Sequence, residues 1–337
     1  MQARKLTTLI RENPMKSKMQ LGLYQFSQLN QEWLTYTKQL GIEKAVIANP
    51  KLPGEGYWEF IDLLRLRTTV EDAGLAVGSI ENVPISFYDK IMLGLPGRDE
   101  QIENMAITIR NMGRAGIKIL GYHWMPNGVW RTSWTTPTRG GASVTSFDYD
   151  LVQNAPLSHG KVFTETEMWE YYEYYMKAIL PVAEEANVKL ALHPDDPPVE
   201  SLAGIPRLFR NLEGFKRGME IGDSPMHGLN FCVGSWSEMG LGVLDTVRHF
   251  GQQRKIFYVH FRDVQGTVPK FSESFVNEGN CDMFQVMKTL KDVGFDGFMI
   301  PDHVPHIIDD TEWGHRGRAY TIGYMTAFLE LLDLYSW

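Results

Sequence analysis

Residues Val188 to Pro198 read Val-Lys-Leu-Ala-Leu-His-Pro-Asp-Asp-Pro-Pro. The apolar residues of the first half indicate a short buried strand. We expect this strand to end at His193, because the prolines that follow can neither continue a β-ladder nor start a helix here. A potential metal ligand therefore stands at the carboxyl end of a buried strand, which is where α/β barrels carry their chemistry.

Three later predicted strands also end at potential ligands, namely Cys232, His260 and Asp302. Each residue taken alone is better explained by packing or capping, but the strand ends of a barrel all converge on one mouth. Together with His193, these side chains predict a site for one divalent metal ion. Imidazole, thiolate and carboxylate suit zinc, iron(II) or cobalt and do not forbid manganese. Cys281 lacks such a position, because it comes just before a predicted helix, and we expect it to be structural.

Strand and helix patterns alternate along the chain without a break in composition. We predict strands over residues 19–26, 44–48, 75–80, 117–122, 188–192, 229–232, 255–259 and 297–300. We predict helices over residues 30–40, 57–73, 99–114, 165–186, 204–212, 241–250, 283–293 and 318–334. Eight strand-then-helix units predict a (β/α)8 TIM barrel of the α/β class. We expect one catalytic barrel domain over residues 19–337, preceded by a basic extension over residues 1–18.

The composition excludes several classes of protein. The formal net charge of the 337 residues is -8, which argues against nucleic acid as a partner. No apolar run approaches the roughly 20 residues of a membrane span, and the basic N-terminus lacks the apolar core of a secretory signal. With only two cysteines, a disulfide framework is not expected, and we predict a cytoplasmic protein.

The segment from Trp124 to about Thr164 is the longest one without sustained periodicity. It is rich in Thr, Ser, Gly, Pro and Trp. Loops of this length in a compact domain are usually functional. We expect a cover over the barrel mouth or an arm that packs on a neighbouring subunit, and a homo-oligomer, either a dimer or a tetramer.

At these residues the chain resembles the mannonate dehydratase family over most of its length. The stretches that carry the resemblance are Lys90 to Met125, Leu192 to Pro198, Asn230 to Ser235, Tyr258 to Val264 and Pro301 to His303. The string His-Pro-Asp-Asp-Pro-Pro is much more specific than a barrel pattern. The resemblance implies a xylose-isomerase-like barrel, in agreement with the independent strand count.

The resemblance also implies an activity and a set of site residues. The family removes water from the sugar acid D-mannonate to give 2-keto-3-deoxy-D-gluconate. By resemblance, the metal would be manganese or iron(II), and His193, Cys232, His260 and Asp302 match its ligands. His303 matches the catalytic histidine. A metal at the carboxylate side of the substrate would stabilise the charge that develops in the reaction.

Two further residues are candidates for binding the substrate. Arg262 would point near the same mouth, where its guanidinium could hold a carboxylate, although a structural ion pair is an equally good explanation. Glu81 stands at the carboxyl end of the third predicted strand and is the second candidate.

The chain departs from the family on the substrate side. The family has Gly-Tyr-Gly-Leu-Tyr before its last helix, where this chain has Trp313-Gly314-His315-Arg316. A family Asn is His123 here, and two family histidines correspond to Ser86 and Val276. Another group must then replace the missing Tyr, and we favour His123 over His315, because a strand holds His123 in place.

These departures keep three hypotheses open. The first is a metal-dependent sugar-acid dehydratase. The second is a metal-dependent isomerase or epimerase acting on a related sugar, because the same barrel and metal can move protons without loss of water. The third is an inactive barrel that binds a sugar acid. The complete set of ligands together with His303 counts against the third.

Overall fold

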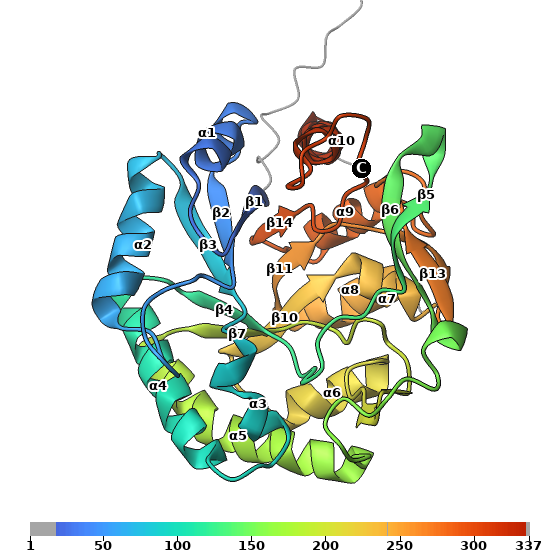
Figure 1. Cartoon of the computed structure of the whole chain (residues 1–337). Coiled ribbons are helices and arrows are strands. Elements are labelled where there is room, and N and C mark those ends of the chain that lie inside the picture. Colours follow the sequence, from blue (N-terminus) through green and yellow to red (C-terminus); the bar gives the residue numbers. More distant parts are fainter. Residues whose placement is uncertain (1–17, 241, 335–337) are drawn as a thin grey trace, which may run out of the picture.

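A computed structural model describes residues 18–240 and 242–334 of the chain. Eight parallel strands close into a barrel in the order β1-β14-β11-β10-β7-β4-β3-β2, and helices surround it (Figure 1). The predicted TIM barrel is confirmed. The predicted N-terminal extension, residues 1–18, lies outside the described residues apart from Lys18.

All eight predicted strands are present, and their ends agree with the prediction to within two residues. The barrel strands are β1 (Gln20–Phe26), β2 (Lys44–Ala48), β3 (Ala76–Glu81), β4 (Ile119–Tyr122), β7 (Lys189–Leu192), β10 (His227–Cys232), β11 (Ile256–His260) and β14 (Phe298–Ile300). Helices alternate with the barrel strands, because the chain must cross back to the starting end of the barrel before it can form the next parallel strand.

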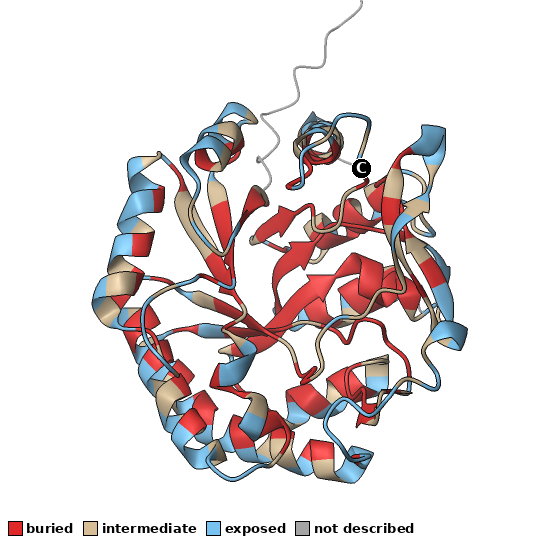
Figure 2. Ribbon diagram, in the orientation of Figure 1, coloured by how far each residue is buried: buried red, intermediate tan, exposed pale blue. Residues whose placement is uncertain are grey.

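Several of the helices that pack around the barrel begin at side-chain caps. The main helices are α1 (Gln31–Gln39), α2 (Phe60–Asp72), α4 (Arg98–Ala115), α5 (Glu165–Ala186), α6 (Leu212–Ile221), α8 (Val243–Gln252), α9 (Met283–Asp292) and α10 (His315–Leu334), with the short helices α3 (Asp89–Met92) and α7 (Val233–Glu238). Of these, α1, α5, α6 and α9 begin at side-chain caps. Helix α5, predicted at the same residues, begins with a capping box in which Thr164 and Glu167 bond to each other's backbone. Figure 2 shows buried strands inside and exposed outer helix faces.

One predicted helix is wrong. Residues 204–212 instead contain the short strand β9 (Ile205–Pro206), which pairs with β8 (Ser201–Leu202). Helix α6 begins only after Asn211, whose side chain accepts a hydrogen bond from Gly214 N–H. The apolar residues of this stretch are buried by tertiary contacts rather than along one helix face, and this is why their spacing misled the prediction.

The segment from Trp124 to Thr164 is more regular than predicted. It forms β5 (Ser133–Pro137) and β6 (Ser143–Asp148), which join β13 (Lys270–Glu273) and β12 (Val264–Thr267) in a four-stranded antiparallel sheet. In Figure 1 this sheet stands at one side of the barrel. Local sequence patterns do not predict this sheet, because β12 and β13 lie more than a hundred residues away from β6 along the chain.

The barrel interior is filled by side chains. The rings of Tyr258 and Phe298 stack at a centroid distance of 5.1 Å, and both residues are buried. The Tyr258 hydroxyl donates a hydrogen bond to Glu81, at the carboxyl end of β3, at 2.9 Å. Among the described residues, no helix is long and apolar enough to cross a membrane.

Candidate metal centre at the barrel mouth

Three of the four predicted ligands meet at the carboxyl ends of the barrel strands. Cys232 and His260 are the last residues of β10 and β11, and the parallel register pairs them directly. His193 follows β7, and its backbone N–H donates to Tyr122 O on the neighbouring strand β4. One ligand atom from each of His193, Cys232 and His260 lies within 4.8 Å of the others. The strand positions alone bring this triad together.

His260 is oriented by groups beneath the mouth. Its Nε2 lies 2.9 Å from Glu81 Oε2 and 2.9 Å from the hydroxyl of Tyr24, so this nitrogen carries the proton that Glu81 accepts. Its Nδ1 is buried and has no hydrogen-bond partner among the described residues. A histidine that binds a metal usually donates its other ring N–H to a carboxylate. His260 has this arrangement, because Nε2 contacts Glu81 while the unpaired Nδ1 faces a thiol and a second imidazole.

His193 has the complementary arrangement. Its Nδ1 donates to the carbonyl of Pro194 at 2.7 Å, which leaves Nε2 available to the triad. Burial alone would raise the pKa of Cys232, but the charge of Arg262 and the nearby imidazoles of His193 and His260 hold it well below its usual value. Two imidazole nitrogens and a thiolate fit a divalent transition metal, with positions left open for substrate.

Asp302 lies beside this triad rather than within it. Its Oδ2 is 3.4 Å from Nδ1 of His260 and accepts a hydrogen bond from Nε of Arg262 at 3.0 Å. Despite burial, the neighbouring His303, His260 and Arg262 hold the pKa of Asp302 well below its usual value. A carboxylate this close to the His260 nitrogen can serve as a fourth ligand.

Arg262 is occupied by the protein's own carboxylates. Besides Asp302, its guanidinium contacts Glu238 at 2.8 Å, Asp196 at 2.9 Å and Glu273 at 3.1 Å. Its side chain is 2% exposed. These contacts favour the structural ion pair, which was the alternative explanation for this residue, over direct binding of substrate.

The same network anchors the segment that carries β5 and β6. Arg131 pairs with Asp196 at 2.5 Å and with Glu273 at 2.8 Å, and its side chain is 1% exposed. Asp196, the second aspartate of the His-Pro-Asp-Asp-Pro-Pro string, therefore bridges two buried arginines. Neither Asp196 nor the ion-pair role of Arg131 was predicted, because the partners lie on separate parts of the chain.

A cavity of about 340 Å³ opens beside the triad. Asp302 and His303 line it, together with Glu81 and Tyr24. Val144 and Thr145 of β6 form part of the same wall, so the segment predicted as a cover contributes to the mouth. His303 projects here with its side chain 33% exposed and its Nε2 3.6 Å from Asp302 Oδ2.

Glu81 has a different position from the one expected of a substrate ligand. It is buried and receives hydrogen bonds from Tyr24 at 2.5 Å and from Tyr258, in addition to its contact with His260. Burial would raise the pKa of Glu81, but its interaction with His260 and the hydrogen bond from Tyr24 lower it below its usual value. Its contacts suit a carboxylate that orients His260, although it also lines the cavity.

The two other histidines considered as acids lie apart from this cavity. Nδ1 of His123 accepts from Met125 N–H at 3.2 Å, and Nε2 lies 3.3 Å from the Tyr88 hydroxyl. Burial and the nearby His193 lower the pKa of His123 to about 3, so its imidazole is neutral at physiological pH. His315 packs against the rings of Tyr36 and Trp313, and its side chain is 15% exposed.

The positions that differ from the family pattern do not share one environment. Trp313 lines the cavity. Ser86 is exposed and lines a neighbouring cavity, and Val276 is buried.

Arg318 was missed by the sequence analysis. Three arginines are buried as whole residues, and Arg207 and Arg262 pair with carboxylates, whereas Arg318 makes no ion pair within the described chain. Its Nε donates to Trp313 O at 2.7 Å, and Nη1 donates to the carbonyl of Pro301. Burial lowers the pKa of Arg318 to about 10, and the residue lines the cavity. A buried cation without a counter-charge is costly and favours an incoming anion.

Asn82 is a second group that the sequence analysis missed. It follows β3 with a left-handed φ of 63° and lines the cavity. Its side-chain Oδ1 is buried without a hydrogen-bond partner among the described residues. Strained, unpaired polar residues of this kind cluster at binding sites.

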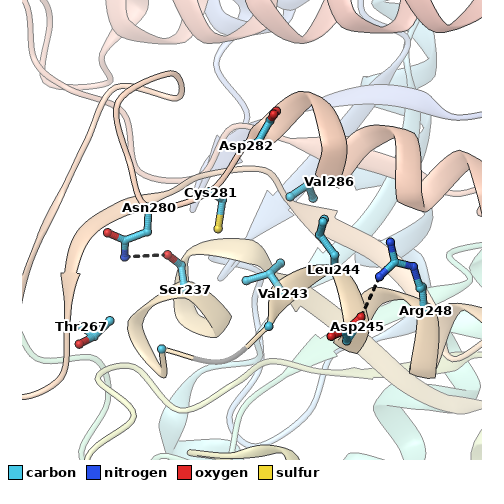
Figure 3. Close-up of a pocket in the computed structure, with 12 residues that line it drawn as sticks. Ser237, Val243, Leu244, Asp245, Arg248, Thr267, Asn280, Cys281, Asp282 and Val286 are labelled. Atoms are coloured by element: carbon cyan, nitrogen blue, oxygen red, sulfur yellow. Dashed lines mark hydrogen bonds and ion pairs between the residues drawn. The ribbon is translucent and has the colours of Figure 1, made fainter.

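A separate cavity of about 420 Å³ lies between α7, α8 and the start of α9 (Figure 3). Cys281 lines it, next to the hydrogen bond from Asn280 to Ser237. Burial and the nearby Asp263 raise the pKa of Cys281 to about 12, so this thiol is not a thiolate. Cys281 is not part of the triad, in agreement with its predicted structural role.

Comparisons with known proteins agree with this geometry. The model of the D-mannonate dehydratase (UxuA) family matches residues 19–161 and 153–335. A mannonate dehydratase of Thermotoga maritima is 32% identical over 314 residues, which cover 82% of this chain and 85% of that protein. Mannonate dehydratase 2 of Halalkalibacterium halodurans is 32% identical over 330 residues, covering 89% and 93%.

Solved structures are similar in the same way. The mannonate dehydratase from Streptococcus suis serotype 2 superposes with a TM-score of 0.86 at 32% identity, covering 94% of this chain and 93% of that one. A D-psicose 3-epimerase from Clostridium cellulolyticum H10 reaches a TM-score of 0.63 at 12% identity, over 92% and 99% of the two chains. This second likeness concerns the fold alone.

We predict that Cys232→Ala lowers the content of bound divalent metal sharply while the barrel stays folded, because it removes one of the ligands held by adjacent strands. Metal analysis of the purified variant together with circular dichroism measures both effects. The matched control is Cys281→Ala, which should keep full metal content. Full occupancy in Cys232→Ala would remove this residue from the ligand set.

Proposed function

Because the chain belongs to the D-mannonate dehydratase (UxuA) family, we propose that it removes water from D-mannonate to give 2-keto-3-deoxy-D-gluconate. The observation that carries this proposal is the triad at the barrel mouth, with its unpaired His260 Nδ1 beside a cavity of about 340 Å³. His193, Cys232, His260 and Asp302 would hold one divalent ion. The family resemblance favours manganese or iron(II), and the ligand types also admit zinc or cobalt.

The chemistry divides between the metal and the chain's own residues. A bound divalent ion would act as a Lewis acid on the substrate carboxylate and stabilise the negative charge that develops there. The reaction takes a proton from C2 and expels the hydroxyl from C3, so it needs a base and an acid. His303 is our proposed base, because it lines the cavity, is partly exposed and stands directly beside the candidate ligand Asp302.

The remaining proposed roles follow from the contacts. Arg318 would bind the substrate carboxylate, because its buried guanidinium donates to backbone carbonyls and makes no ion pair within the described residues. Asn82 would accept a hydrogen bond from a substrate hydroxyl at its unpaired Oδ1. Glu81 and Arg262 would position His260 and Asp302. His123, neutral and beside Tyr88, stays a second candidate as a hydrogen-bond donor to the departing hydroxyl.

The alternative function is an isomerase or epimerase of a related sugar, which the loss of the family's tyrosine keeps open. The two functions differ in their products. Incubation of the metal-loaded protein with D-mannonate should yield a 2-keto-3-deoxy acid, which is lighter by one water. An isomer of unchanged mass would establish the alternative, and absence of metal-dependent turnover across a panel of aldonates would support an inactive sugar-acid-binding protein.

We predict that His303→Asn lowers kcat by about 10²–10⁴-fold, the usual contribution of a positioned acid or base. Metal content should remain complete, because His303 stands beside the ligand Asp302 without belonging to the triad. Steady-state kinetics with metal analysis of the same preparation test this. His123→Asn is the matched comparison and should lose much less. An equal loss in both variants would give His123 an equal share in proton transfer.

We predict that Arg318→Gln raises KM for the sugar acid by about 10- to 100-fold, as expected when a hydrogen bond to a charged group is lost. Inhibition by the neutral polyol D-mannitol should change little, because it has no carboxylate. The control is Arg316→Gln, whose side chain is 53% exposed on the same helix. If acid and polyol lose affinity equally, Arg318 acts by supporting the loop carbonyls rather than by binding the carboxylate.

We also propose that strand β5 contacts a second copy of the chain. It is the edge of its sheet, carries no charged residue and leaves Trp134 72% exposed, whereas free edges are usually protected by charge. Trp134→Ser should therefore lower the molar mass measured by light scattering after gel filtration. Ile61→Ser, on α2, is the control for loss of an exposed apolar side chain. A wild-type monomer would refute the interface.

A further inference from the structure

The end of the barrel opposite the metal centre carries a basic cavity of about 940 Å³. Its walls come from the amino ends of the strands, including the starts of β1, β2, β4, β7 and β11, whereas the triad stands at carboxyl ends. Six cationic side chains and one carboxylate, Asp296, line it. The cations are Lys18, Lys44, Lys118, Lys189, Lys291 and Arg254.

This concentration of positive charge contrasts with the chain as a whole, whose formal net charge is -8. Only Lys291 has a carboxylate partner, Asp333, at 3.7 Å; within the described residues the other five cations make no ion pair. Lysines that face one cavity repel one another unless an anion lies between them. The cavity therefore concentrates a positive potential that its own residues do not neutralise.

Helix ends explain part of this pattern. The carboxyl ends of the barrel helices point to this face, and a cation there is favourable. Lys118 interacts with such a helix end: its Nζ donates a hydrogen bond to the carbonyl of Gly113, in the last turn of α4, at 3.3 Å. Lys189 Nζ lies 4.7 Å from the ring centroid of Phe257. Lys18, Lys44 and Arg254 have no such contact among the described residues.

We propose that this cavity is a second binding site, for a small organic phosphate that carries several negative charges. Its volume lies within the range of small-molecule sites, at about 300–1,000 Å³. Phosphate oxygens are the acceptors that clustered Lys and Arg side chains recognise. The apolar residues Phe257, Phe298 and Ile119 also line the cavity and offer a surface to the organic part. The N-terminal segment of the chain is not a suitable ligand for this cavity, because the segment is itself basic.

The test is titration calorimetry of the metal-loaded protein with ATP, pyrophosphate and orthophosphate at physiological salt. Saturable binding of one ATP or pyrophosphate per chain is expected, with orthophosphate much weaker because it carries fewer charges. The double variant Lys44→Gln/Lys189→Gln should bind at least about tenfold more weakly. Its turnover without phosphates should match wild type, because neither lysine is near the metal centre.

Two controls separate this site from other sources of binding. Polyphosphates also bind metals, so the titration is repeated with the metal-poor Cys232→Ala variant, in which binding should persist. Lys177→Gln/Lys216→Gln removes two lysines on α5 and α6, outside the cavity, and should change nothing. Loss of binding in Cys232→Ala, equal loss in the control pair, or no saturable binding would each overturn the proposal. None of these results depends on which sugar acid is turned over.

Discussion

The contact of Arg262 with four carboxylates holds the barrel mouth together. Its partners come from four separate places along the chain: Asp196 after β7, Glu238 in α7, Glu273 in β13 and Asp302 after β14. Asp196, Glu238 and Glu273 are almost completely shielded from water, whereas the Asp302 side chain is 15% exposed. Removal of one member of a buried charge network typically costs about 3–5 kcal/mol. Through Asp302 this network sets the position of a candidate ligand, and through Asp196 it reaches Arg131 and the added sheet.

A second, smaller network performs the same task for His260. The Nε2 atom of His260 is held by Glu81 and Tyr24, and Glu81 in turn accepts hydrogen bonds from Tyr24 and Tyr258. The other nitrogen, Nδ1, is therefore left to face Cys232 and His193. The barrel interior is thus polar at one level and apolar below it, where Tyr258 stacks on Phe298. The candidate metal centre therefore depends on residues outside the triad, because hydrogen bonds from such residues fix the orientation of the ligands.

One difference from the family pattern lies on the wall of the cavity beside the triad. Trp313 lines the cavity in the segment where the family has its tyrosine, and the next helix brings Arg318 to the wall. The triad lies at or directly after the ends of β7, β10 and β11, whereas Trp313 lies between β14 and α10, and Arg318 lies at the start of α10. A site built in this way can change its substrate contacts while it keeps its metal.

The sequence alone determined the barrel, because buried parallel strands leave nearly continuous apolar runs, and it placed His193, Cys232 and His260 at one mouth, because a strand places its last residue at a known end. It also located both ends of α5 (Glu165–Ala186), and the structure adds the capping box at Thr164. Only the tertiary structure decided what depends on contacts between distant segments. These are the pairing of β6 with β13, the bridging of two arginines by Asp196, the engagement of Arg262 and the unpaired state of Arg318. Local patterns cannot report such features, because a charged side chain looks the same in sequence whether its partner is a protein carboxylate, a substrate or water.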